Sequence, residues 1–227
     1  MTVIELPGGG EQNIETSTTA TIGLSYGERT QAGQPFELTY EQLEVTAAGN
    51  SPDLSALIGK PITGTIDENG EVAIQDAPEI DLPGADPASL ASQTLGLLMI
   101  PLPPGGDPEA ESWPLERTRS PGGGMTGTTT FTGTAHFTSE TEWQGQPART
   151  IVSEGNLAQR GTGTPPGAPS EIDTDFEGES TTTYVWDPAR GVVLHAEQRL
   201  DMDGTISMQE MALPTTITAT YALDLLP

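Results

Sequence analysis

The chain has 227 residues, 34% of them hydrophobic, and its 33 acidic and 8 basic residues give a formal net charge of −25. This excess of carboxylates excludes nucleic-acid backbones and anionic membrane surfaces as natural partners, because binding either requires clustered Lys and Arg. The absence of cysteine excludes disulfides, thiolate nucleophiles and zinc–thiolate sites.

Near its N-terminus the sequence has a Gly-rich stretch, PGGG at 7–10, that interrupts any regular element. We expect residues 1–12 to form a flexible leader. Residues 13–227 are expected to form a single β-rich domain, since all-β domains often reach this length as one unit.

Two long strands are predicted next, at 19–30 and 35–49, where apolar and polar residues alternate with a period of two. In the second strand the apolar residues change from even to odd positions. This change of phase predicts a β-bulge near Glu41 and Gln42.

A short helix is predicted at 51–59, because a serine is placed to cap it, a proline follows and a glycine ends it. Residues 61–75 then alternate on both sides of Asn69-Gly70. An Asn-Gly pair supplies the positive φ angles of a tight primed turn, so this segment is predicted to be a β-hairpin.

A second helix is predicted at 86–100, with Asp86 as its cap, Pro87 in the first position and Pro101 as its stop. One face of this helix carries an apolar stripe. Its members are Leu90, Leu95, Leu98 and Met99.

The second half of the chain is predicted to be a meander of five long antiparallel strands separated by short polar connections. They span 127–143, 146–159, 172–186, 191–202 and 205–225. The Gly- and Pro-rich segments 101–114 and 161–171 are expected to be exposed loops.

The segment DMDGTISMQE, at 201–210, has two interpretations. Asp201, Asp203 and Glu210 match three positions of a calcium-binding loop, but Arg199 stands where the first carboxylate ligand is required. The flanking residues alternate like strands, whereas a calcium loop of this type lies between helices. We therefore favour a hairpin with Asp203-Gly204 as its two-residue turn.

Other candidate chemistry in the sequence is sparse. His136 and His195 lie in predicted strands and could share a metal with Glu140 or Glu197, but no ligand spacing supports this and we expect no metal site. No G-x-S-x-G nucleophile motif is present. A pair of glycosidase carboxylates cannot be singled out among so many acids, so we expect no catalytic residues and no cofactor.

The three tryptophans, Trp113, Trp143 and Trp186, have two interpretations. They could line a sugar- or lipid-binding surface. The alternative, which we favour, is that they fill the ends of a sheet with a thin core.

The order of several short motifs resembles that of a group of bacterial secreted or lipid-anchored envelope proteins of unknown function. The motifs are LEVTAAGN, LSALIGKPITGTIDENGEVAI, ESWPLER and YVWDPARGVVLHAEQRLDMDGTISM, and the resemblance spans residues 13–226. The Pro-rich turn before Trp113 is longer here, as PLPPGGDPEAESW, than in that group.

The resemblance implies an α+β, mainly β fold like the half-barrel of the lipoprotein carriers. In that fold a curved antiparallel sheet carries two short helices packed on its concave face. It also implies a non-enzymatic, monomeric (lipo)protein exported to the periplasm or cell surface and anchored upstream of Met1. Its partner would be a lipid or another apolar molecule in a cavity lined by Leu90, Leu95, Leu98, Met99 and Trp113.

Two alternatives remain open at this point. The first is a structural or protein-interaction module whose concave face is fully packed. The second is a hydrolase of envelope glycans, which would need two carboxylates facing each other in a cleft.

Overall fold

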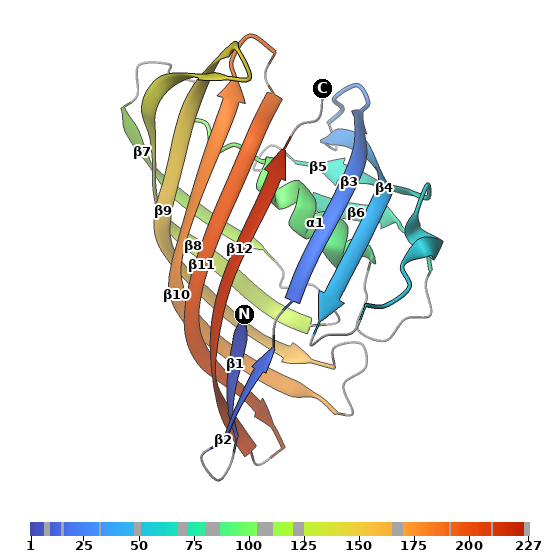
Figure 1. Cartoon of the computed structure of the whole chain (residues 1–227), viewed down its shortest axis with the longest axis vertical. Helices are drawn as coiled ribbons and strands as arrows, with labels where there is room; N and C mark the ends of the chain where they lie inside the picture. The colour runs from blue at the N-terminus through green and yellow to red at the C-terminus, as the bar shows by residue number, and fades with distance from the viewer. Residues whose placement is uncertain are drawn as a thin grey trace.

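The computed structural model describes residues 1–6, 10–14, 16–31, 33–47, 51–67, 72–79, 87–103, 111–119, 125–164, 170–190, 192–209 and 211–224. These residues form two antiparallel sheets with one α-helix between them (Figure 1). The prediction of an α+β, mainly β fold is confirmed. No helix in these ranges is long and apolar enough to span a membrane.

The larger sheet has eight strands in the order β2-β1-β12-β11-β10-β9-β8-β7, and it curves along one side of the molecule (Figure 1). Its strands are β1 (Thr2–Leu6), β2 (Gly10–Ile14), β7 (Ser112–Arg119), β8 (Met125–Trp143), β9 (Gln146–Gly163), β10 (Ile172–Asp187), β11 (Val192–Met208) and β12 (Met211–Asp224). The meander predicted for the second half of the chain is therefore confirmed.

The smaller sheet has four strands in the order β3-β4-β5-β6. They are β3 (Thr16–Tyr26), β4 (Gln34–Ala47), β5 (Pro61–Ile66) and β6 (Val72–Asp76). The register of β3 against β4 passes from Thr21↔Gln42 to Ile22↔Tyr40, so Glu41 is the extra residue of the predicted bulge. Strands β5 and β6 form the predicted hairpin, whose Asn69-Gly70 turn lies outside the described residues.

Helix α1 (Pro87–Leu98) lies between the two sheets (Figure 1). Its buried residues Ala91 and Leu95 pack on the smaller sheet, against a core that includes Leu38, Tyr40 and Ile62. The helix predicted at 86–100 is thus confirmed, while its predicted cap lies outside the described residues.

The helix predicted at 51–59 is only one turn of 3-10 helix, Ser55–Leu57. It lies against β4, where the Gly59 amide donates to the Tyr40 carbonyl at 2.9 Å and Ile58 forms a bridge with Tyr40. The expectation of one curved sheet with two helices on its concave face is corrected to two sheets with one α-helix between them. The apolar residues of 51–59 are too few for a longer helix to gain by packing.

Two further expectations differ from the structure. Thr2–Leu6 pairs with β12 and with Gly10–Ile14, so these residues are strands of the larger sheet and not a flexible leader. Ser112–Arg119 is an edge strand, so the segment predicted to be a loop at 101–114 includes the start of β7. Its Pro114 is tolerated because an edge strand can leave one side of its backbone unpaired.

The prediction of a hairpin turn at Asp203-Gly204 is also wrong. Strand β11 continues through both residues to Met208, and Met208 pairs with Met211 across the next connection. Gln209, with φ of 55°, lies in that connection. The calcium-loop interpretation of the same segment requires flanking helices, and the segment instead lies within an antiparallel ladder.

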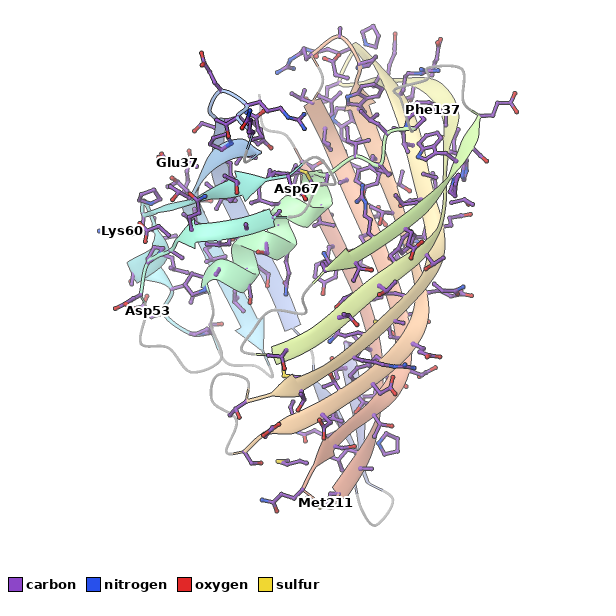
Figure 2. All side chains as sticks on the ribbon, turned by 180° about the vertical axis from the view of Figure 1, so that it is seen from behind. Glu37, Asp53, Lys60, Asp67, Phe137 and Met211 are labelled. Atoms are coloured by element: carbon purple, nitrogen blue, oxygen red, sulfur yellow. The ribbon has the colours of Figure 1, made fainter. Side chains whose placement is uncertain are left out.

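The two faces of the larger sheet differ in composition. We call the face toward α1 the concave face, because Trp113 and Tyr184 on it form one cluster with Leu98 and Ile100 at the end of the helix. The cross-strand register assigns every other residue of β7–β12 to this face. Figure 2 shows Phe137 and Met211 at opposite ends of the sheet.

Candidate ligand site on the concave face

The five predicted lining residues do not form one group. Leu90, Leu95 and Met99 pack toward the smaller sheet, in the core that α1 shares with it. Leu98 contacts both this core and the concave face of the larger sheet. Of the five, only Trp113 belongs to the concave face itself, so the predicted stripe mainly joins α1 to the smaller sheet.

Trp113 is 4% exposed and packs against Phe137, with ring centroids 5.2 Å apart. Its indole Nε1 is buried and has no hydrogen-bond partner among the described residues. A buried donor without a partner costs about 1–3 kcal/mol. Trp186 packs against the same cluster as Trp113, whereas Trp143 lies elsewhere and stacks on His195, with ring centroids 4.9 Å apart.

An apolar cluster covers the concave face at a distance from Trp113. We call it the apolar floor. Its members come only from strands β8 to β12 of the larger sheet and include no residue of α1 or the smaller sheet. They are Phe131, Leu157, Phe176, Leu200, Met202, Ile206 and Ile217.

Two arginines of edge strand β7 face the same side as the floor. Arg117 is the cross-strand partner of Phe131, and Arg119 is the partner of Thr129. Residues that are directly opposite each other share one face of a sheet. Within the described ranges, the carboxylates that form ion pairs with arginine do so with Arg160, Arg190 and Arg199, and none reaches these two.

Arg117 is held by polar contacts. Its Nη1 donates to the Met99 carbonyl just after α1, at 3.3 Å. It also forms a hydrogen bond with the side chain of Tyr184. Tyr184 belongs to β10, which is separated from β7 by strands β8 and β9 of the same sheet. Burial raises the pKa of Tyr184 above its ordinary value, and the neighbouring Arg117 opposes this rise. Arg117 therefore joins the edge strand, the end of the helix and the middle of the sheet.

Arg119 lies beside α1. A Cβ on Gly96 of the helix would be 3.1 Å from Arg119 Nη1, so the guanidinium approaches the helix where the side chain is absent. Burial lowers the pKa of Arg119, and the positive charge of Arg117 lowers it further, while Tyr221 and Tyr184 act in the opposite direction. The residue nevertheless stays exposed to solvent, as does Tyr221, which is 42% exposed. A group surrounded by protein yet open to solvent is typical of a concavity.

Acidic side chains avoid this face. Over the paired segments 113–119, 125–137, 151–163, 172–184, 196–208 and 213–223, the register places no Asp or Glu on the concave side, and Arg117 and Arg119 are the only charged residues there. The opposite, convex face carries Asp173, Asp175, Glu177 and Glu179 on β10 alone. Toward the β8–β9 turn, beyond these segments, the register adds Arg149, which lies over the Phe137 ring, and Glu140 directly opposite it. The part of the concave face beside the floor is thus cationic in a strongly acidic chain.

The histidines do not come together. Two strands separate β8, with His136, from β11, with His195. His195 Nδ1 lies 2.7 Å from Asp224 Oδ1. Within the described ranges there is no group of three or more His, Asp or Glu that could hold a metal ion.

Two surface hollows lie elsewhere. One, of about 440 Å³, is lined by polar residues that include Thr126, Arg160 and Asp175. The other, of about 760 Å³, is lined by residues at the opposite end of β8 and β9, including Glu140 and Arg149. Neither is lined by α1, so they are separate from the arginine pair.

Comparison with known proteins adds no relative. No family model matches the chain, and no curated protein or solved structure matches it either. What the concave face can do must therefore be argued from its own residues.

The sequence did not single out the arginine pair, because charged residues lie mostly on the solvated surface of proteins. A signal was present: in SWPLERTR, Trp113, Leu115, Arg117 and Arg119 occupy alternate positions. Once Trp113 is taken as buried, a period of two places both arginines on the same side. The loop predicted at 101–114 includes Trp113, so it hid the start of that period.

Proposed function

We propose that this chain is a non-enzymatic binding protein of the cell envelope that holds a lipid or another apolar ligand against the concave face of its larger sheet. The observation that carries the proposal is the apolar floor, whose members come from one sheet only. Apolar surface is stabilised when it is removed from water, by about 25 cal/mol per Å². Leu157, Phe176 and Met202 are already buried, so a ligand chain placed on this floor would gain that free energy from the area that the partly buried Phe131, Leu200, Ile206 and Ile217 still expose.

Two features of the surrounding residues support the proposal. Helix α1 packs mainly on the smaller sheet, so it is not needed to complete the floor. Tyr221, on the concave face, is a large side chain that remains exposed. Binding sites for small molecules are typically concave and largely apolar with a few placed polar groups.

The envelope location rests on the sequence resemblance described above. Its test is the gene itself: we expect a secretion signal with a lipobox cysteine upstream of the codon for Met1. A gene without one would remove the location from the proposal and leave the ligand-binding part standing.

Ligand binding has a direct test. Protein purified from its own host is examined by native mass spectrometry, and we expect a co-purifying lipid. The delipidated protein is then titrated with a pyrene-labelled long-chain alcohol, whose uncharged head group isolates the contribution of the apolar chain.

A pair of variants makes this titration specific. Leu200→Asp places a carboxylate on the floor and is expected to weaken alcohol binding at least about tenfold, because a charge cannot be buried under an apolar chain. Thr220→Asp makes the same charge change at an exposed position of β12, on the convex face, and should leave binding unchanged. Circular dichroism confirms that both variants fold.

A clean apo mass together with no binding of the alcohol would contradict the proposal. The concave face would then be a packed or protein-covered surface, as in the structural-module alternative.

A further inference from the structure

Beside the apolar floor, over the paired segments named above, the only two charged residues on the concave face are both arginines, in a chain with 33 acids. The next charges on this face, Arg149 and Glu140, lie directly opposite each other near the β8–β9 turn, where Arg149 covers the Phe137 ring. Three of the other arginines have carboxylate partners within 4 Å. This segregation calls for a physical reason, because unpaired cations surrounded by protein lose hydration without a compensating partner.

We propose that Arg117 and Arg119 bind the oxyanion head group of a long-chain amphiphile whose apolar chain lies on the floor. This inference rests on the proposed function and adds to it the chemical class of the ligand. A planar guanidinium presents a fork of N–H donors that matches a carboxylate or a phosphate, and two forks side by side can hold one such group.

The geometry supports this assignment in three ways. Arg117 and Arg119 are two residues apart on one strand, so their side chains leave the sheet in the same direction. Arg117 lies directly opposite Phe131, a member of the floor, so the head-group site and the floor adjoin. Arg117 is fixed by Met99 and Tyr184, which orients its remaining donors.

Arg119 supplies the open side of the site. Its guanidinium lies beside Gly96 of α1 but remains exposed, so an anion can reach it from solvent. Burial lowers the pKa of Arg119 and the charge of Arg117 lowers it further, so an anion beside the two guanidiniums would offset their repulsion. The arriving anion also gains a charge-assisted hydrogen bond.

The charges of the convex face favour anion binding on the concave face. Carboxylates on β10 and β11 repel anions from the outer surface, for example Glu179 directly opposite Asp201. The concave face is shielded from them by the sheet itself. An anionic amphiphile is thus excluded from the rest of the molecule and accepted on this face alone.

The test compares two pyrene-labelled ligands with the same chain, a fatty acid and the corresponding alcohol, at neutral pH. We expect the wild-type protein to bind the acid at least about tenfold more tightly than the alcohol, the ratio that one charge-assisted hydrogen bond of about 1.4 kcal/mol supplies. Arg119→Gln should weaken binding of the acid by about the same factor and so remove this preference. Arg119→Lys, which keeps the charge and loses the fork, should restore part of it.

The matched control is Arg199→Gln, which makes the same charge change on the convex face, where Arg199 pairs with Glu197. It should alter neither titration. Equal binding of acid and alcohol by the wild type, or an acid preference that survives both Arg119→Gln and Arg117→Gln, would overturn the head-group assignment and leave the proposed function intact. Failure to bind either ligand would overturn both.

Discussion

Tyr40 and Tyr184 are phenols in the interior, and both respond to burial in the same way. Tyr40 is fully buried with its hydroxyl 3.4 Å from Thr94 Oγ1 of α1, and Tyr184 is 4% exposed beside Arg117. Burial raises the pKa of each above the ordinary 10.0, because the phenolate would lose its hydration. Each side chain therefore favours the folded state only while it remains protonated.

The consequence is a loss of stability in alkali. A group whose pKa is raised on folding gives its full contribution below its unfolded pKa of 10.0 and loses it as the pH rises through the folded value. We expect the free energy of unfolding to fall above pH 10.0, and less steeply in the double variant Tyr40→Phe, Tyr184→Phe. Urea denaturation at pH values on both sides of 10.0 measures this. Identical slopes for the two proteins would show that these phenols do not cause the loss.

Individual residues also show how far the candidate site could be predicted from the sequence. Trp113 and Leu98 were found from their apolar character, and both contribute to the concave face. Arg117 and Arg119 were not found, because a sequence does not distinguish a solvated charge from one that folding surrounds. The curvature that takes Arg117 to Tyr184 is a property of the whole sheet.

At the scale of elements, aromatic rings on several strands cover glycines of the neighbouring strand. A Cβ on Gly204 would be 2.5 Å from Phe176 Cδ1, one on Gly155 would be 2.9 Å from Phe131 Cζ, and one on Gly64 would be 2.8 Å from the Phe36 ring. Such covering of strand glycines by aromatic residues is a known way to pin register. The Phe176–Gly204 contact lies where β11 stays paired with both neighbouring strands, at the position for which the sequence predicted a turn.

Gly204 therefore gives a test of the corrected hairpin. Its absent side chain would also meet the Asp175 carbonyl at 2.1 Å, so Gly204→Ala must displace backbone as well as the Phe176 ring. We expect a loss of about 1–3 kcal/mol, the usual range for overpacking. Chemical denaturation followed by tryptophan fluorescence measures it.

A control at a real turn sharpens this result. Gly145 has φ of 80° and open space around its Cβ position, in the connection between β8 and β9. Gly145→Asn should cost less than Gly204→Ala, because asparagine tolerates the left-handed region. The reverse order would indicate that residues 203–204 form the turn after all.

The elements that the sequence predicted well share one property: their signal is local. The bulge at Glu41, helix α1 and the long strands of the meander follow from the spacing of apolar residues within each segment. The turn of the last hairpin was predicted wrongly because Asp-Gly is a common turn sequence. In the structure, Gly204 instead makes room for Phe176 on the neighbouring strand β10. The division into two sheets depends on contacts between distant segments, which periodicity does not record.

At the scale of the whole molecule, the larger sheet separates charge between its faces. The part of the concave face around the apolar floor carries Arg117 and Arg119 and no carboxylate, whereas the convex face carries rows of carboxylates. Like charges directly opposite each other on neighbouring strands are destabilising. Glu177 faces Asp203 and Glu179 faces Asp201, so the convex face stores repulsion that salt can screen.

Glu179→Gln tests this stored repulsion. Removing one charge of the Glu179–Asp201 pair is expected to stabilise the fold by roughly 0.5 kcal/mol at low ionic strength, and the gain should vanish in molar salt, where the screening length falls to about 3 Å. Glu177→Gln is the matched control, because Glu177 also accepts a hydrogen bond from Arg160 at 3.1 Å and its removal sacrifices that attraction. Urea titrations at both salt concentrations measure each change. A gain for Glu179→Gln that persists in molar salt would assign its origin to packing or propensity, because screened charges could no longer produce it.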